Sequence, residues 1–159
     1  MDLTEYKPEN HLKLLAGAQY SDEDGISLIE MANGGTLFLE HIEQISPAAQ
    51  AKLLDILQFN DFKPEQGLRS SKVELRVIAG TSFTPDELKK TEELKPDFIS
   101  LITYSIVDIP TLRERIDDLE TMIRHLLRSY GAKYGRGNFR LNETTISQLK
   151  KYNWPGNYR

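Results

Sequence analysis

Two short apolar runs, each followed at once by polar residues, constrain the fold of this chain more than any other feature. The first is residues 36–39 (TLFL), which follow the turn residues Gly34 and Gly35 and lead into Glu40. A short apolar run of this kind is typical of a strand that is buried on both faces of a sheet. The second run lies in residues 73–78 (VELRVI) and closes at residues 80–81 (GT), which predicts a second strand.

The segment between the two runs predicts a helix. Ser46 followed by Pro47 is a good helix start, because the serine hydroxyl accepts a hydrogen bond from a free backbone amide and proline lacks the amide that would be left unbonded. Leu53 and Ile56 then recur at helical spacing, and the helix should end near Asn60. A strand, a helix and a second strand in this order favour a parallel pair.

Further along the chain the pattern changes from mixed to helical. Residues 84–93 and 96–102 predict two short helices, and residues 105–109 predict a third short strand. After Pro110 one apolar stripe marks a long amphipathic helix: Ile116, Leu119, Ile123, Leu126 and Leu127. Asn142 is placed to cap a last helix. We therefore expect an α/β core with a parallel sheet in residues 1–110 and a helical subdomain in residues 111–159.

Composition excludes several classes of function. The chain has no cysteine, which excludes disulfides and cysteine zinc sites. Its formal net charge is −4, from 20 Lys plus Arg against 24 Asp plus Glu, which argues against this segment binding nucleic acid by itself. Its apolar runs are far shorter than the roughly 20 residues of a membrane span, and residues 1–10 do not resemble a signal peptide. We therefore expect a cytoplasmic location and no membrane partner.

Four stretches carry a family pattern. They are residues 33–42 (NGGTLFLEHI), like a Walker B strand of the form GGTLFLDEI; residues 50–58 (QAKLLDILQ), like QxKLLRVLQ; residues 75–81 (LRVIAGT), like VRVIAATN; and residues 110–115 (PTLRER) with 154–159 (WPGNYR), like PPLRER and WPGNVR. In this order they resemble the central domain of sigma-54-dependent activators, the NtrC-type AAA+ ATPases. The resemblance covers roughly residues 28–159 and implies an incomplete AAA+ (P-loop NTPase-like) core followed by a helical lid.

The resemblance also implies a set of site residues. Glu40 and His41 take the places of the Walker B acidic pair, with Glu40 a ligand of Mg²⁺ through water. Thr81 and Ser82 lie at the tip of the next strand, where they would contact nucleotide. Arg159 takes the place of the lid arginine that contacts phosphate.

Several of these positions depart from the family pattern. His41 replaces the glutamate that polarises the attacking water, and Ser82 replaces a longer asparagine. The two positions of the trans-acting arginines fall on Lys95 and Leu101, of which only the lysine keeps a positive charge and neither keeps the guanidinium fork. An exposed lysine and a buried leucine are the structural alternative at these two positions.

Two motifs of the family are missing from the printed sequence. The phosphate-binding pattern GxxxxGK[ST] does not occur in residues 1–159. The sigma-54-contacting GAFTGA loop has no counterpart in residues 1–30, where residues 16–18 (AGA) are at most a remnant. Efficient hydrolysis and remodelling of sigma-54 polymerase are therefore not expected of this segment.

The leading hypothesis is a segment of a bacterial transcription regulator whose AAA+ domain acts through assembly and partner contacts, with impaired ATP hydrolysis. The resemblance implies RNA polymerase and its sigma factor, further copies of the chain, and DNA through a C-terminal helix-turn-helix as partners of the full-length protein. ATP with Mg²⁺ is a candidate ligand of the full-length protein, and no cofactor is expected for this segment. The alternatives are an active ATPase whose phosphate loop lies outside the chain and a sensor of a nucleotide second messenger.

Overall fold

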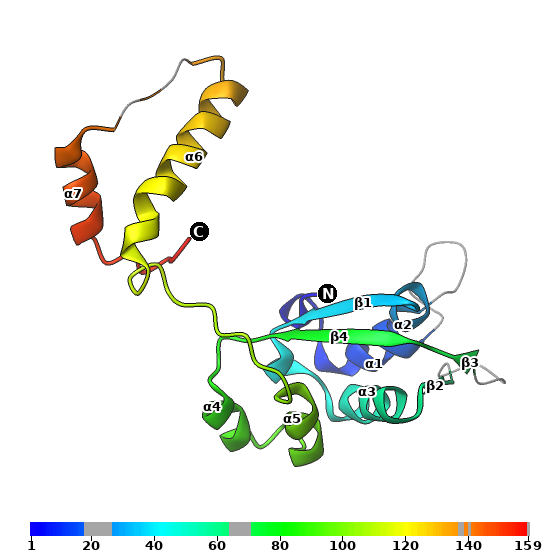
Figure 1. The fold of residues 1–159 in the computed structure, drawn as a ribbon. Coiled ribbons are helices and arrows are strands. Elements are labelled where there is room, and N and C mark those ends of the chain that lie inside the picture. The colour runs from blue at the N-terminus through cyan, green and yellow to red at the C-terminus, as the bar shows by residue number, and fades with distance from the viewer. Residues whose placement is uncertain (18–26, 64–70, 137–138, 140, 159) are drawn as a thin grey trace. The chain divides into compact units, whose positions relative to one another are not determined.

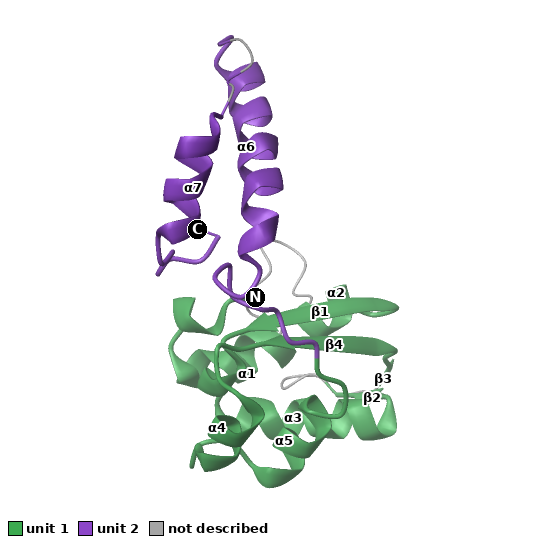
Figure 2. Cartoon of the chain, turned by 60° about the vertical axis from the view of Figure 1, so that its left-hand side comes forward, with its two compact units in different colours: residues 1–106 green, residues 107–159 purple. Residues whose placement is uncertain are grey.

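The computed structural model describes residues 1–17, 27–63, 71–136, 139 and 141–158, in two compact units, residues 1–106 and residues 107–159 (Figure 1, Figure 2). The sequence pattern places the boundary near Pro110. The elements of unit 1 are η1 Leu3–Glu5, α1 Pro8–Ala16, α2 Leu28–Met31, β1 Gly35–Glu40, η2 Ile42–Gln44, α3 Pro47–Phe59, β2 Asp61–Phe62, β3 Ser71–Lys72, β4 Leu75–Gly80, α4 Pro85–Lys90 and α5 Pro96–Ile102. Those of unit 2 are η3 Ile116–Asp118, α6 Leu119–Lys133 and α7 Glu143–Lys151.

The two predicted strands form a parallel pair. Leu37 of β1 lies opposite Val77 of β4, and Leu39 lies opposite Ala79. The helix that joins them, α3, begins at the Ser46 cap, whose hydroxyl accepts from the amide of Ala49 at 3.4 Å, and it ends at Asn60 in the left-handed conformation. The parallel α/β arrangement expected from the sequence is confirmed.

The sheet is covered on one face only within the described residues. Leu37 and Leu39 are buried, and α1, α3 and α5 lie on one side of the two strands in both ribbon views (Figure 1, Figure 2). Phe38 and Ile78 point to the opposite face, where 47% and 43% of their surface is exposed. Burial of β1 on both faces was therefore a wrong prediction, because consecutive strand residues alternate between a covered and an open face.

On the open face, the ring of Phe38 packs against Gly80. A Cβ atom at this position would lie 3.1 Å from Cζ of Phe38, so that the aromatic ring lies across the glycine. The far end of the Phe38 ring thus lies against Gly80, and a side chain at position 80 would require the ring to shift by a few tenths of an ångström.

The third predicted strand does not form. Residues 105–109 adopt no regular structure, and Ile106, Val107 and Ile109 are exposed. In the described part of the chain, β4 pairs with β1 alone, so this apolar segment has no hydrogen-bonding partner. Two smaller differences are α2, which the sequence did not predict, and α4, which ends at Lys90 rather than near Glu93.

Residues 1–17, which carry only a weak pattern, are held by a buried histidine. Nδ1 of His11, in α1, accepts from the amide of Ser46 at 3.2 Å, so Nε2 carries the proton and donates toward the carbonyls of Leu3 and Tyr6. The ring is fully buried. It ties the start of the chain to the cap of α3, a structural role for a residue type that is often functional.

Unit 2 brings together the two halves of the fourth motif. The amide of Leu112 donates to Oδ1 of Asn157 at 2.9 Å, and the guanidinium of Arg113 donates to the carbonyl of Asn153 at 2.8 Å. Nε1 of Trp154 donates to the carbonyl of Leu149 at 2.9 Å. Residues 110–115 and 153–158 therefore form one structural feature at the base of α6 and α7.

Candidate functional site

The tips of β1 and β4 meet at the same edge of the sheet. Glu40, the last residue of β1, lies opposite Gly80, the last residue of β4. The residues that follow, His41 on one strand and Thr81 and Ser82 on the other, therefore leave the sheet side by side. The carboxyl edge of a parallel sheet is where α/β proteins bind ligands. The predicted residues of the two strand tips are thus brought together.

Glu40 is half-buried at this edge. Its amide donates to the carbonyl of Met1 at 2.9 Å, and a bridge pairs it with Asp2. The first two residues of the chain therefore run along the edge of β1 that faces away from β4. This contact was not expected from the sequence.

His41 is turned toward that outer edge. Its backbone is left-handed, with φ 57°, a conformation that non-glycine residues rarely adopt and that histidine tolerates better than most. Its Nδ1 lies 2.9 Å from Oδ1 of Asp2. Asp2 also accepts from the hydroxyl and the amide of Thr4; these bonds, with a smaller contribution from His41, lower the pKa of the Asp2 carboxyl to about 2. His41 is thus a partner of the N-terminal segment.

A second carboxylate lies on the side of the β1 tip that faces β4, which we call the inner side. Glu43, in η2, is 8% exposed, and its Oε2 accepts from the hydroxyl of Thr81 at 2.6 Å. The Thr81 hydroxyl in turn accepts from the amide of Phe83 at 3.1 Å. Ser82 lies exposed in the bend between them. Glu43 was not predicted as a site residue. The signal in the sequence is its place between two apolar residues, Ile42 and Ile45, which are both fully buried in the structure.

The two trans-acting positions lie on α5. Lys95 is exposed, as the structural alternative supposed, and occupies the N-cap position of this helix without a capping hydrogen bond from its side chain. Leu101 is half-buried, whereas that alternative supposed a buried leucine. Gln50 of α3 fixes the start of α5, because its Oε1 accepts from the amide of Lys95 at 2.9 Å while its Nε2 donates to the carbonyls of Ile45 and Glu93. Gln50 is fully buried and every hydrogen of its amide is used.

The remaining predicted positions do not contribute to a site in the described structure. Arg159 and Ala18 lie outside the described residues. Ala16 and Gly17 have a structural explanation, since Ala16 is buried at the end of α1 and a Cβ on Gly17 would lie 2.6 Å from the carbonyl oxygen of Lys13. In the described part of the chain, no group of three or more His, Cys, Asp or Glu is placed to hold a metal. Glu40 alone fits Mg²⁺ only if phosphate and water oxygens fill the other positions.

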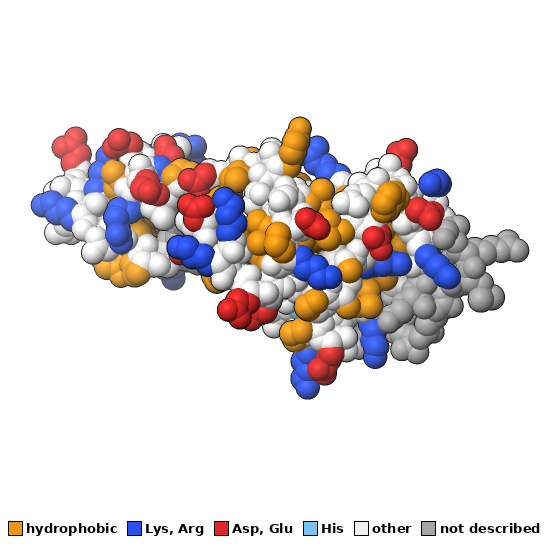
Figure 3. Space-filling model, turned by 90° about the horizontal axis from the view of Figure 1, so that it is seen from below, with side chains coloured by type: hydrophobic (Ala, Val, Ile, Leu, Met, Phe, Trp, Pro, Cys, Tyr) orange, Lys and Arg blue, Asp and Glu red, His pale blue; other side chains and the backbone are white. Residues whose placement is uncertain are grey.

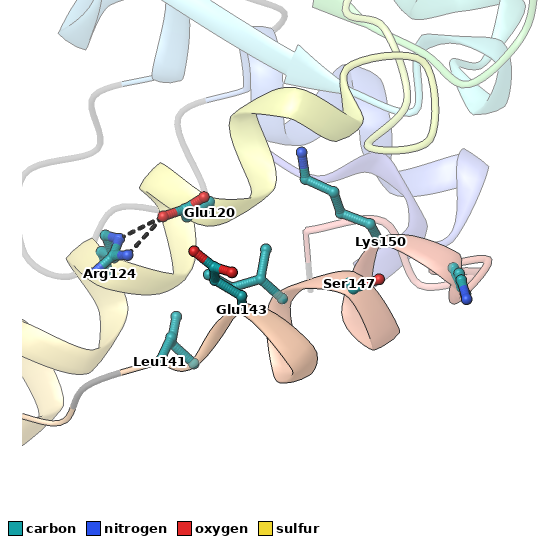
Figure 4. A pocket seen from close by; sticks show the side chains of 8 residues that line it. Glu120, Arg124, Leu141, Glu143, Ser147 and Lys150 are labelled. Carbon is teal, nitrogen blue, oxygen red and sulfur yellow. Dashed lines mark hydrogen bonds and ion pairs between the residues drawn. The ribbon is translucent and has the colours of Figure 1, made fainter.

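Unit 2 has a hollow of its own. It has a volume of about 620 Å³ between α6 and α7 (Figure 4). Arg124 in its wall donates twice to Glu120, and Ser147 and Lys150 face it from α7. Among the described residues, none of those predicted for the nucleotide lines this hollow, and its walls carry charges of both signs.

The surface is also mixed in charge. On the face shown in Figure 3, Lys and Arg side chains are interspersed with Asp and Glu and with hydrophobic side chains. No helix in the described ranges is long and apolar enough to cross a membrane.

Comparison with protein families gives two matches that follow each other along the chain. Residues 15–107 match the model of the "Sigma-54 interaction domain", and residues 113–159 match that of the "AAA+ ATPase lid domain". The first match covers more than half of the chain and contains both strand tips.

Among known proteins, the chain is similar to regulators of transcription. It is 35% identical over 130 residues to the transcriptional regulatory protein XylR of Pseudomonas putida, a match of 82% of this chain and 23% of the relative. It is 34% identical over 137 residues to the hydrogenase transcriptional regulatory protein HoxA of Bradyrhizobium diazoefficiens, a match of 86% of this chain and 28% of the relative. The chain thus spans about a quarter of the length of these relatives.

Among solved structures, NtrX of Brucella abortus in complex with ADP is similar over 99% of this chain and 35% of its own, with a TM-score of 0.85 and 22% identity. The complex of the same protein with ATP has the same TM-score and 21% identity. At this level of identity the likeness confirms the fold.

Proposed function

This chain belongs to the family of sigma-54 interaction domains and carries an AAA+ lid, and on that basis we propose that it is the assembly and partner-binding module of a bacterial transcription regulator with weak or lost ATP hydrolysis. Residues 1–110 are then a partial AAA+ core and residues 111–159 its lid. The partners of the intact protein are RNA polymerase with its sigma factor and further copies of the same chain. DNA would be bound by a separate helix-turn-helix, and the protein works in the cytoplasm.

ATP with Mg²⁺ is the ligand proposed for the strand tips of the intact protein. Glu40 would hold the metal through water, and Thr81 and Ser82 would contact the nucleotide, with Arg159 on its phosphates. Lys95 would face the nucleotide of a neighbouring subunit as a point charge without the fork of an arginine. The metal neutralises charge on the phosphates when bound, and the residues of this chain orient them.

The conformation of His41 carries the proposal of impaired hydrolysis. An efficient catalytic base must reach the water that attacks the phosphate, at about 2.6–3.2 Å or through one further water. His41 follows Glu40 directly but takes a left-handed turn to the outer edge of β1, where it is bonded to Asp2. The position that should polarise water is therefore occupied by a side chain engaged elsewhere.

The test separates assembly from hydrolysis. The intact protein is mixed with RNA polymerase and its sigma factor, and the size of the complexes is measured by light scattering with ATP and with a non-hydrolysable analogue. We expect the same complexes in both, and the same again for Glu40→Gln. Complexes that form with ATP but not with the analogue would show that hydrolysis drives assembly and would rule the proposal out.

A further inference from the structure

Glu43 is an acidic side chain that is buried beside the tips of β1 and β4. It is almost fully buried, and its hydrogen bond in the described structure is with the Thr81 hydroxyl. The ion pairs of the described residues do not include Glu43. Burial of a carboxylate costs free energy unless a cation or several donors compensate it, and a single hydroxyl compensates it poorly.

The position of Glu43 relative to the two strands is specific. β1 has β4 on one edge and residues 1–2 on the other. His41 bonds to Asp2 on the outer side, whereas Glu43, two residues later, bonds to Thr81 directly after β4. The short η2 turn thus carries a carboxylate back to the inner side of the tips, where the loops after both strands converge.

We propose that Glu43 is the base of the residual ATP hydrolysis of this protein, with Thr81 as the positioning residue that orients it. The inference rests on the proposed nucleotide site at the strand tips. A water molecule forms a bond from its oxygen to the γ-phosphorus, the bond from that phosphorus to the bridging oxygen of ADP breaks, and the water proton passes to a carboxylate oxygen of Glu43. Glu43 then returns the proton to solvent.

The proposal is tested on ATP turnover by the intact protein. Glu43→Gln keeps the shape and the acceptor for Thr81 but cannot take up a proton, and we expect turnover to fall by about 100-fold. The affinity for a fluorescent ATP analogue should stay within about twofold, because the change acts on the chemical step. Thr81→Val removes the orienting hydroxyl and should lower kcat by about tenfold, with a smaller rise in KM because Thr81 is also proposed to contact the nucleotide.

Glu74→Gln is the matched control. Glu74 is an exposed glutamate that precedes β4, at the opposite end of that strand from Thr81. The substitution is chemically the same, and turnover should remain at the parent level.

A second readout is independent of turnover. Neutralising a buried carboxylate while keeping its hydrogen bond should leave the melting temperature unchanged or raise it. A residue that serves stability gives the reverse result, a lower melting temperature with turnover retained. That result overturns the assignment of Glu43.

The remaining outcomes separate this inference from the proposed function. Unchanged turnover in Glu43→Gln, or no measurable turnover in the parent protein, overturns the role of Glu43 and leaves the assembly function standing. Fast turnover that depends on Glu40 contradicts the assembly function, and the Glu43→Gln result then still decides the role of Glu43.

Discussion

The interior of unit 1 and the tips of its two strands keep very different parts of the family pattern. In the interior, Leu37, Leu39 and Gln50 occupy buried positions in the stretches that resemble the family, and each is packed or fully bonded. At the tips, His41 and Ser82 depart from the pattern, and Glu43 carries the buried carboxylate. A framework of apolar side chains and one buried amide thus fixes the fold, while the polar residues at its edge are free to change without loss of that fold.

The largest effect is expected from a truncation in the interior. Leu39→Ala should lower the free energy of unfolding by about 2–5 kcal/mol, because Leu39 is fully buried in the core of unit 1 and its loss leaves a cavity. Phe38→Ala, one residue earlier on the open face, should cost clearly less although it removes more atoms. Urea denaturation measures both. Equal losses would mean that the open face is covered in solution.

A smaller loss is expected from the buried amide. Gln50→Leu should cost about 1–3 kcal/mol, because the carbonyls of Ile45 and Glu93 and the amide of Lys95 lose their partner. Gln58→Leu is the matched control, since Gln58 is exposed on the same helix and should change stability by less than about 0.5 kcal/mol. If the two variants unfold at the same urea concentration, Gln50 is not the link between α3 and α5.

Substitution at the tip should cost less still. His41→Gly relieves the strain of the left-handed backbone, which is worth about 1–2 kcal/mol. It also removes the contact between His41 and Asp2, whose side chains are 35% and 28% exposed, and this loss is destabilising. Glycine further lowers stability because it has more conformational freedom in the unfolded chain. These effects oppose each other, so stability should change by less than about 1 kcal/mol. Thermal unfolding measures this. A loss of stability as large as that of Leu39→Ala would show that His41 is one of the residues that hold the fold together.

The smallest effect is expected from acid titration of Asp2. Its pKa is about 2 in the folded protein against an ordinary value of 3.8, so the folded state holds the ionised form more strongly. The stability that this provides is complete above pH 4 and is lost as the pH falls toward 2. Asp2→Asn should flatten the dependence of the melting temperature on pH in this window only. An identical dependence of the melting temperature on pH in the variant would show that the Asp2 carboxylate does not stabilise the fold.

Much of the fold could be predicted from the sequence because short-range signals agree with long-range packing. The proline after Ser46, the apolar spacing of α3 and the two runs fix a parallel pair. The open face could not be predicted, since residues 36–39 are apolar at three consecutive positions and do not show which side is covered. The strand at residues 105–109 failed for a related reason, because its pattern is suitable but strand formation depends on a partner that no local signal reveals.

The candidate site was predicted in part. The register of the strands brings Glu40 and Thr81 to one edge, as the order of the motifs implies. The left-handed backbone of His41 and the 3₁₀ turn after it decide that the His41 side chain bonds to Asp2 and that the Glu43 side chain bonds to Thr81. No proline or glycine in the sequence marks either feature. The pairing of Asp2 with His41 joins residues 39 positions apart, which spacing alone does not reveal.

The central claim, that the framework is retained while the chemistry of its edge is changed, is tested most directly by steady-state ATP turnover of the intact protein and its Glu40→Gln variant. We predict turnover well below the roughly 1–1,000 s⁻¹ of typical enzymes, in a protein that keeps its melting temperature in the variant. Turnover within that range, abolished by Glu40→Gln, would show that the strand tips are an efficient catalytic site and would contradict the account.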